Sequence, residues 1–438
     1  MAVADDKRER KRVVVIGNGI SAVSALTALK GRQKAEVVAI FAHEFLEWNL
    51  SATYFFANPS TYDQFVSRDK TLFEVPGVTY VYDVVEAVEP STKTLKLRGA
   101  GPMAYDALIV ASGYKLPLIQ RGLGQTYAQR KAEVQEWGAA IAAAKTVVVS
   151  GPGAIGLEYA ADIKLAHPKT RVVLLSRSGT LMNDAYPDRL KQKFAEVLKK
   201  QNIELLKGSG GTEPTKEPAS LTLDDGTTLE YDVFIPAFGQ GVQTAFLPSS
   251  LLDKKGAVVT NQFLQSTSAP EIFAVGVNST GQGFSAPKLD QQAKDAGKNA
   301  VKVALEGPSA ALAPHKENQP SKDWGNRPMT VKIGYGPGGY IFWDAEQFDP
   351  AFTTITCKGQ GGFPLWPCVC CWCCAGSCSH ACGTCGSECE GEPAARFYQN
   401  FFGTGGVGLF TKMFGLKGFG KAPAGGGPVK AEAPMERA

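Results

Sequence analysis

The sequence predicts an α/β protein with two similar parallel-sheet units, followed by a β-rich C-terminal unit and a cysteine-rich extension. The segment VVVIGNGISAVSALTAL at 13–29 has the pattern of a buried strand, a tight glycine turn and a helix. VVVSGPGAIGLEYAADI at 147–163 repeats this pattern. Runs of Val and Ile are typical of central parallel strands, because both faces of such a sheet are covered. All ten cysteines lie between Cys357 and Cys389, which sets the C-terminal region apart.

Composition and charge exclude several classes of protein. The 438 residues are 44% hydrophobic and 20% charged, so the chain as a whole is not disordered. The net charge of +4 is too small to indicate a nucleic-acid partner. The apolar stretches are shorter than the roughly 18 residues of a membrane span, and the N-terminus lacks the apolar core of a signal peptide. We therefore expect a cytoplasmic or peripherally membrane-associated protein.

The other elements of the two units follow in chain order. Residues 1–12 are predicted to be a charged leader. VVLLSRSG at 172–179 predicts the next strand of the second unit. LTLDDGTTLEYDVFIPAFG at 221–239 predicts a hairpin with an Asp-Gly turn and then a buried strand. EIFAVGV at 271–277 predicts a further strand, and a helix is expected at 290–305.

The C-terminal region divides by composition. Glycine and proline become frequent at 306–327, which indicates a linker before a β-rich unit at 325–356. A cysteine-rich segment at 357–395 comes next, and a basic segment rich in Phe and Gly at 396–421 follows it. The Gly-, Pro- and Ala-rich tail at 422–438 is predicted to be disordered.

The two glycine turns have the spacing of dinucleotide-binding turns. The first glycine makes the turn, the second lets the backbone approach a pyrophosphate, and a small third residue lets helix and strand pack closely. The phosphate then lies at the N-terminus of the helix, where backbone N–H groups are free. A glycine turn that merely packs is the alternative, but two turns in the same context predict two Rossmann-like domains. The turn residues are Gly17, Asn18, Gly19 and Ala22 in the first unit and Gly151, Gly153 and Gly156 in the second.

Two dinucleotide sites in one chain indicate a protein that places a nicotinamide ring against a flavin. The residues before Cys357 include no cysteine, so no dithiol there can relay electrons. Electrons are then expected to leave the flavin directly, to a quinone, oxygen or another diffusible acceptor. Hydride transfer depends on positioning more than on acid–base catalysis, and the sequence identifies no catalytic residue.

Several segments together resemble a known family. In their order and spacing, they resemble the apoptosis-inducing-factor-like and ferroptosis-suppressor-like FAD-dependent NAD(P)H:quinone oxidoreductases. The resemblance implies an FAD-binding domain at 13–140 and 255–305, with an NAD(P)H-binding domain inserted at 141–254. It also implies a C-terminal unit of a kind that often contacts a membrane. Besides the glycine turns and the hairpin, the segments are EWNLSATYFFANPS at 47–60, YDALIVASG at 105–113, QTAFL at 243–247 and APEIFAVGV at 269–277.

The resemblance also implies which residues contact the cofactors. An ordinary salt bridge is the alternative role for Glu158. The position that distinguishes NADH from NADPH falls near Ser176 and Arg177, where an acid favours NADH and an Arg accommodates a 2′-phosphate. These residues therefore favour NADPH, and a solvated strand-end Arg is the alternative. The FAD contacts implied are the first turn with Ala111, Ser112, Gly113 and Gly276, and the NAD(P)H contacts are the second turn with Glu158 and Gly239.

Two positions depart from the family's pattern. An acid that binds the ribose of FAD is expected at the end of the second strand, and Phe41 stands there. His43 and Glu44 are the nearby substitutes. The family's later motif has an Asp where this chain has Val277. Each lost charge-assisted hydrogen bond removes about 1.5–3 kcal/mol.

The sequence thus leaves three hypotheses for function. The first is an oxidoreductase that transfers hydride from NAD(P)H to FAD and on to a quinone. The second is a catalytically degenerate member of the family that acts as a structural or interaction subunit. The third is a metal or redox sensor that uses the cysteine cluster.

The cysteine cluster has three interpretations. Dense thiolates suit zinc or another soft metal, and Cys378, Cys382, Cys385 and Cys389 are the candidate ligands, with His380 as an alternative. FPLWPCVCCWCC is an apolar stretch whose cysteines suit S-acylation. Disulfides are the third interpretation, and the expected compartment disfavours them. The segment at 396–421 is predicted to contact a membrane, to bind a protein partner or to pack on the core.

Overall fold

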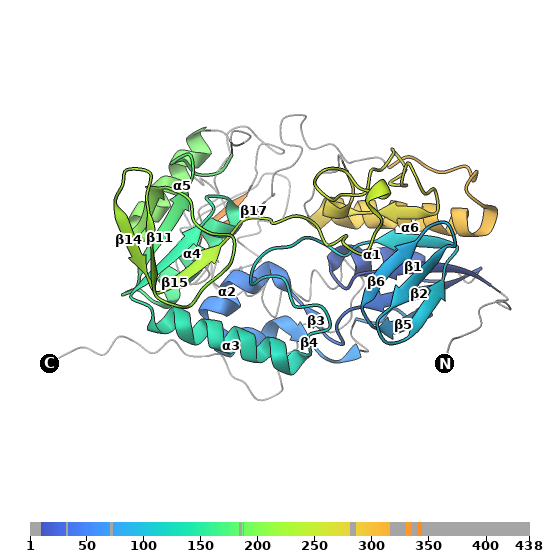
Figure 1. Ribbon diagram of the computed structural model, residues 1–438, viewed down its shortest axis with the longest axis horizontal. Coiled ribbons are helices and arrows are strands. Elements are labelled where there is room, and N and C mark those ends of the chain that lie inside the picture. Colours follow the sequence, from blue (N-terminus) through green and yellow to red (C-terminus); the bar gives the residue numbers. More distant parts are fainter. Residues whose placement is uncertain are drawn as a thin grey trace, which may run out of the picture.

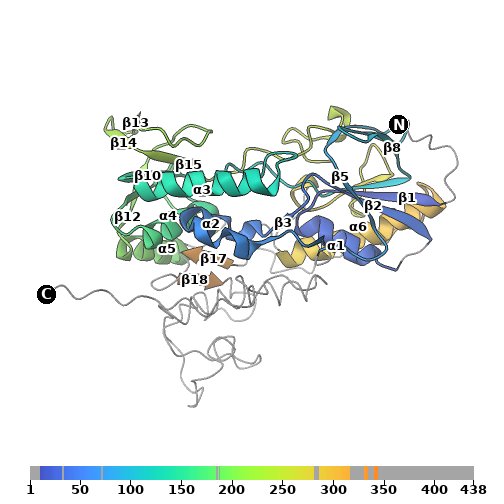
Figure 2. The ribbon, with the colours of Figure 1, turned by 90° about the horizontal axis from the view of Figure 1, so that it is seen from below.

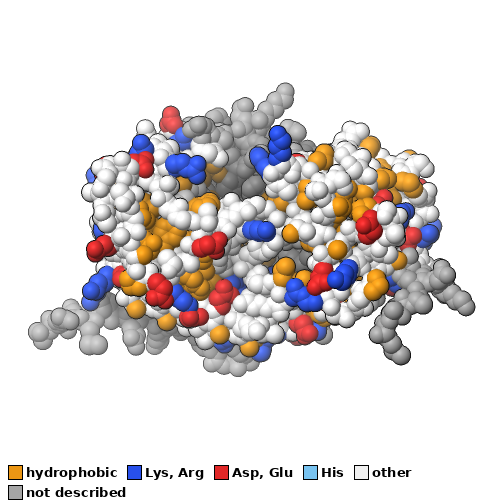
Figure 3. All heavy atoms as spheres, viewed as in Figure 1, with side chains coloured by type: hydrophobic (Ala, Val, Ile, Leu, Met, Phe, Trp, Pro, Cys, Tyr) orange, Lys and Arg blue, Asp and Glu red, His pale blue; other side chains and the backbone are white. Residues whose placement is uncertain are grey.

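The computed structural model describes residues 10–31, 34–70, 73–183, 186, 188–280, 286–315, 330–333 and 340–343. Figure 1 shows two lobes, each with a sheet and packed helices. One lobe combines N-terminal segments with segments that follow residue 255, whereas the intervening chain forms most of the other lobe. Charged side chains of both signs are scattered over the face seen in Figure 3, with hydrophobic side chains between them.

The first lobe is built on a five-stranded parallel sheet. Its order is β16-β9-β1-β2-β5. Because side chains alternate along a strand, Val13 and Val15 pack on the side of the helices α1 and α6, while Val14 and Ile16 face a small antiparallel sheet, β6-β7-β8. The elements are β1 (Lys11–Ile16), α1 (Ile20–Leu29), β2 (Ala35–Phe41), β5 (Thr79–Tyr82), β6 (Val85–Glu89), β7 (Thr94–Leu97), β8 (Gly101–Ala104), β9 (Ala107–Val110), β16 (Ile272–Ala274) and α6 (Ala286–Glu306).

The second lobe is built on a four-stranded parallel sheet in the order β12-β11-β10-β15. Val147 and Val149 pack toward α4, and Val148 faces Leu229 and Phe234 on the other side. The hairpin β13–β14 turns at Gly226, whose φ of +84° suits glycine. The elements are β10 (Thr146–Ser150), α4 (Ala154–Ala166), β11 (Arg171–Ser176), α5 (Asp188–Lys200), β12 (Ile203–Lys207), β13 (Ala219–Thr222), β14 (Thr228–Tyr231) and β15 (Val233–Pro236).

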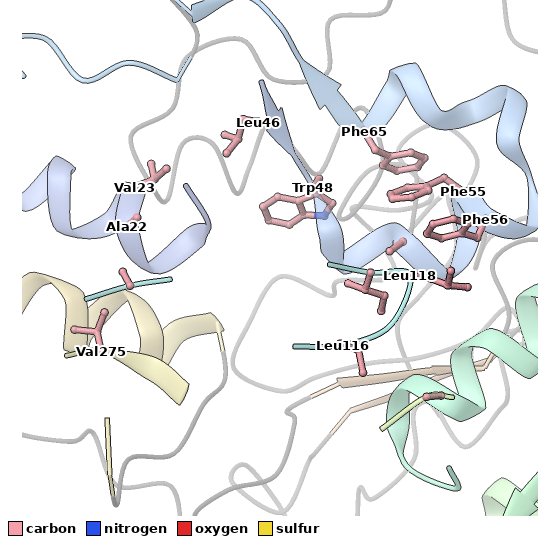
Figure 4. Close-up of a cluster of buried hydrophobic side chains, with 14 of the residues drawn as sticks. Ala22, Val23, Leu46, Trp48, Phe55, Phe56, Phe65, Leu116, Leu118 and Val275 are labelled. Carbon is pink, nitrogen blue, oxygen red and sulfur yellow. The ribbon is translucent and has the colours of Figure 1, made fainter. Parts of the chain in front are cut away.

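A block of short elements from the first half of the chain joins the two lobes. Figure 4 shows its aromatic side chains, among them Phe55, Phe56 and Phe65, beside Leu116 and Leu118. The Thr53 hydroxyl donates to Asp162 of α4 at 2.8 Å, so α2 is bonded to the second lobe. The block comprises β3 (Leu46–Glu47), η1 (Asn49–Ser51), α2 (Ala52–Ala57), η2 (Pro59–Phe65), β4 (Val66–Ser67) and α3 (Tyr127–Ala143).

The structure confirms the predicted strands and the hairpin, but two elements begin earlier in the chain than the sequence predicts. Strand β1 begins at Lys11, within the predicted leader, because the Arg12 backbone N–H donates to Asp106 and its guanidinium donates to Glu36, at 2.8 Å each. Helix α6 begins at Ala286, four residues before the predicted start.

Of the predicted β-rich unit, two strands are described. They are β17 (Thr330–Ile333) and β18 (Tyr340–Trp343), an antiparallel pair, and β17 lies against α4 (Figure 2). Among the described residues, no helix has the length and hydrophobicity needed to cross a membrane.

Candidate functional site

The first glycine turn lies between β1 and α1 and leaves its backbone open. Gly17 has a φ of +122°, and a Cβ there would lie 2.2 Å from the Ala111 carbonyl oxygen, so only glycine fits. Gly19 has no atom within 4 Å of where its Cβ would be, and no side chain caps α1 there. Ala22 is fully buried against the core. The geometry therefore fits a pyrophosphate at the N-terminus of α1.

The second glycine turn repeats this construction between β10 and α4. Gly151 has a φ of +124°, and a Cβ on Gly156 would lie 1.8 Å from the Gly151 carbonyl oxygen. Gly153 has open space beside it and caps α4 without a side-chain bond. Both turns thus have the tight, close-packed and open positions that a dinucleotide requires.

The loop after β9 lies behind the first turn. The Ala111 carbonyl backs Gly17, and Gly113 has a φ of +81° with no atom within 4 Å of a Cβ position. The Asn278 side chain bonds both the N–H and the C=O of Gly113, and the Ser112 hydroxyl donates to the Gln243 carbonyl. No motif marks Asn278 in the sequence, apart from its position just after the Ala-x-Gly motif.

The same loop is tied to the segment that returns from the second lobe. The backbone N–H of Lys115 donates to Gly241, that of Gln240 donates to Lys115, and that of Gln243 donates to Gly113, each at 2.9 Å. The predicted residue Gly239 directly precedes this segment and has open space beside it. These bonds hold the loop that follows β9 in the first lobe against the segment that follows β15 in the second lobe.

Glu158 and Tyr114 bring α4 to this junction. Burial raises the pKa of Tyr114, and the nearby carboxylate of Glu158 raises it further. Because that electrostatic effect requires proximity, the α4 residue predicted to contact NAD(P)H lies near the loop predicted to contact FAD. The predicted contacts of both cofactors therefore meet at one place.

Arg121 places an additional positive charge beside the first turn. Its guanidinium donates to the Asn18 side-chain oxygen at 3.2 Å and to the Phe45 carbonyl at 3.3 Å. Among the described residues no carboxylate lies within ion-pair distance of it, whereas the neighbouring Arg130 pairs with Glu47. An anionic pyrophosphate would complement this cation. No local motif marks Arg121 in the sequence.

At the end of β2, the structure shows what occupies the position of the expected acid. Phe41 is fully buried, and its ring packs edge-on against Tyr80 at 5.2 Å. His43 is also buried, with Nε2 bonded to the Gly122 carbonyl at 2.8 Å. Glu44 is exposed and lies 3.4 Å from Lys70. The last position of β2 therefore presents a buried aromatic ring where the family's pattern has a carboxylate.

Gly276 and Val277 lie side by side after β16, in the motif where the family's pattern has a Gly followed by an Asp. Val277 lies in the short helix η5 (Gly276–Asn278), next to the buried Asn278. A Cβ on Gly276 would lie 2.7 Å from the Leu289 side chain, so this glycine serves close packing. Its N–H donates to the buried Gln292 at 2.8 Å.

At the end of β11, only one of the two predicted side chains is available to a ligand. The Ser176 side chain is buried, and its hydroxyl donates to the Thr180 carbonyl at 2.6 Å. Arg177 is exposed, and no described residue is bonded to it. The nucleotide preference of this site therefore depends on Arg177 rather than on the Ser176 hydroxyl.

The candidate metal ligands lie outside the described residues. This holds for Cys378, Cys382, Cys385 and Cys389, and for the segments at 357–395 and 396–421 and the tail. Within the described part of the chain, no group of three or more His, Cys, Asp or Glu side chains is arranged to hold a metal ion.

Comparison with known proteins identifies the family. Residues 11–297, well over half of the chain, match the family described as pyridine nucleotide-disulphide oxidoreductase. The chain belongs to this family. Because the match covers both glycine turns and the loop between the lobes, it is an FAD-dependent NAD(P)H oxidoreductase, and the resemblance that the sequence indicated is confirmed. The hypothesis of a degenerate subunit finds no support.

Individual relatives agree with this assignment. The chain is 26% identical over 337 residues to Oxidoreductase ptaL of Pestalotiopsis fici, which covers 70% of this chain and 86% of ptaL. It is 24% identical to ferroptosis suppressor protein 1 of Xenopus tropicalis, over 61% of this chain and 74% of that protein. Among solved structures, the sulfide:quinone oxidoreductase of Aquifex aeolicus has a TM-score of 0.54 at 17% identity, over 68% of this chain and 78% of that one, and shows the same fold.

Proposed function

We propose that the protein oxidises NADPH and reduces a quinone, with FAD as its cofactor. In this proposal residues 13–140 and 255–305 bind FAD, and residues 141–254 bind the nicotinamide nucleotide. FAD, when bound, would supply the two-electron redox chemistry that links the nicotinamide nucleotide to the acceptor. The protein's part is to orient the two nucleotides against each other, which is the main requirement of hydride transfer.

The observation that carries the proposal is the junction between the lobes. Three backbone hydrogen bonds join the loop at 113–115 to the returning segment at 240–243. Glu158 of α4 lies close enough to Tyr114 to raise its pKa. A nicotinamide ring held by the second lobe and a flavin held by the first lobe would meet there.

The quinone as acceptor is supported by the residues around the junction. The described residues contain no cysteine, so within them no dithiol can receive electrons. This favours a small acceptor that takes electrons directly from the flavin, and a quinone takes up two electrons and two protons. The segment at 396–421, with its Phe and basic residues, would suit contact with a lipid surface that carries the quinone.

One experiment tests this function step by step. The full chain is purified without added cofactor and its visible absorbance is recorded before and after addition of FAD. We expect flavin bands that bleach under anaerobic conditions with NADPH, and faster with NADPH than with NADH. The bands should return on addition of a water-soluble ubiquinone analogue. Absence of flavin even with excess FAD would disprove the proposal. If the bands return with oxygen but not with the quinone, the acceptor is oxygen and the proposed quinone is wrong.

A further inference from the structure

Asn278 devotes its whole side chain to one loop. Asn278 directly follows Val277, and Val277 is the position at which the family's pattern has a cofactor-binding acid. Asn278 is 1% exposed. Its Oδ1 accepts a hydrogen bond from the Gly113 N–H at 2.8 Å. Its Nδ2 donates to the Gly113 carbonyl at 3.0 Å and to the Ser112 hydroxyl oxygen at 3.3 Å. A single side chain therefore fixes both backbone groups of Gly113.

The loop that Asn278 holds needs such support. Gly113 has a left-handed backbone, and glycine loses more conformational freedom on ordering than any other residue. The loop presents bare backbone to open space at Gly113, while the Ala111 carbonyl fits tightly against Gly17 of the first turn. A movement of Gly113 would therefore disturb both the open face and the turn.

We propose that Asn278 is a positioning residue for the flavin. It holds Ser112 and Gly113 in the geometry that receives the ring system, and it acts through Gly113 rather than by contact with the cofactor. A loop ordered in advance reduces the free-energy cost of ordering it on binding. Preorganisation by Asn278 would favour FAD binding at a site where Phe41 and Val277 supply no carboxylate. The inference rests on the FAD-dependent function proposed above.

The chain offers a matched control for testing this role. Asn299 is also 1% exposed and clamps one residue in the same way, because its Nδ2 donates to the Ala313 carbonyl at 2.9 Å and its Oδ1 accepts from the Ala313 N–H at 3.1 Å. It lies on α6 and packs the chain that follows this helix. Replacing either Asn by Asp keeps the volume and one acceptor but turns the donor into an oxygen that faces a carbonyl.

The test compares Asn278→Asp, Asn278→Ala and Asn299→Asp in the full chain, with FAD as the probe. For both Asn278 variants we expect altered flavin absorbance bands, a dissociation constant for FAD that is about tenfold higher, and a kcat that is about tenfold lower. The KM for NADPH should stay within about twofold, because the second turn is untouched. Asn299→Asp should lower the melting temperature and leave the flavin spectrum and kcat unchanged.

Two results would overturn the inference. One is Asn278→Asp with the spectrum, FAD affinity and kcat of the wild type. The other is the same spectral change in Asn299→Asp, because a general loss of packing would then explain both. A wild-type protein that binds no FAD would instead overturn the proposed function itself, so the two failures are distinguishable.

Discussion

Arg130 and Glu47 form a bidentate ion pair in which both side chains are fully buried, with Nε to Oε2 at 2.9 Å and Nη2 to Oε1 at 3.1 Å. The Tyr62 hydroxyl donates to the same carboxylate at 2.7 Å. Arg130 lies on α3, the helix that leads into β10, and Glu47 lies on β3, so both residues belong to the block that joins the two lobes. The pair therefore holds two elements of this block together.

Removing one charge of this pair should destabilise the protein strongly. Glu47→Gln removes the fully buried carboxylate partner of Arg130 and leaves the guanidinium only the part-exposed Glu133, whose Oε2 lies 3.0 Å from Nη1. Breaking a buried pair in this way costs about 3–5 kcal/mol. The control is Glu204→Gln, since Glu204 pairs with Arg171 in the same bidentate geometry but at the surface. Exposed pairs contribute about 0–1 kcal/mol. Urea denaturation measures both, and equal losses in the two variants would contradict the prediction.

The same pair gives stability a dependence on acid pH. Burial alone would raise the pKa of Glu47, but Arg130 and Arg121 outweigh it and hold the pKa below its ordinary value of 4.5. The contribution of Glu47 is therefore complete above about pH 4.5 and is lost as the pH falls through the lower pKa of the folded state. The difference in stability between wild type and Glu47→Gln should shrink in that range, which urea titrations at several pH values would show. A difference that stays constant down to pH 3 would count against the ion pair as its source.

His43 should make the protein less stable between pH 6.5 and pH 3. Burial, together with Arg121, lowers the pKa of His43 from 6.5 to about 3. Below pH 6.5 His43 binds a proton in the unfolded chain but stays neutral in the folded state. The free energy of unfolding therefore falls by up to about 1.4 kcal/mol for each pH unit. His43→Gln should flatten this slope. Urea denaturation of the wild type and of His43→Gln at several pH values measures the slope, and an equal slope in the two proteins would contradict the prediction.

Arg121 should bind the pyrophosphate of FAD through its charge. Arg121→Ala removes the one unpaired guanidinium that the described residues place beside Asn18, and we expect about a tenfold to hundredfold weaker FAD affinity. Flavin fluorescence quenching at 50 and 300 mM salt measures this loss. Arg121→Lys should recover part of the affinity, and the wild type should lose more affinity with salt than Arg121→Ala does. Equal salt dependence of the two proteins would assign Arg121 a structural role instead.

The strands and turns of the fold could be predicted from the sequence because their signals are local. Gly17 and Gly151 stand after apolar strands, and the positive φ values confirm the turns that this spacing predicted. The hairpin at Gly226 follows from its Asp-Gly pair in the same way. Boundaries were harder to place, since Arg12 looks like part of a charged leader until Asp106 and Glu36 are seen to bind it.

The supporting residues of the site could not be predicted because their partners are distant in sequence. Asn278 bonds Gly113, 165 residues away, and Arg121 bonds Asn18, 103 residues away. Neither contact leaves a spacing pattern that a single sequence reveals. Ser176 shows the opposite case, because its position fitted a ligand contact while its hydroxyl is used inside the turn.

Arg177 should determine the preference for NADPH. It is the exposed side chain at the end of β11, where a guanidinium can pair with a 2′-phosphate. Arg177→Ala should raise the KM for NADPH about tenfold or more and leave the KM for NADH unchanged, because NADH has no 2′-phosphate. Arg171→Ala is the control, since Arg171 lies at the opposite end of the same strand, and it should alter neither value. A parallel rise of both KM values in Arg177→Ala would show that the side chain serves nucleotide binding in general, and the discrimination would have to come from elsewhere.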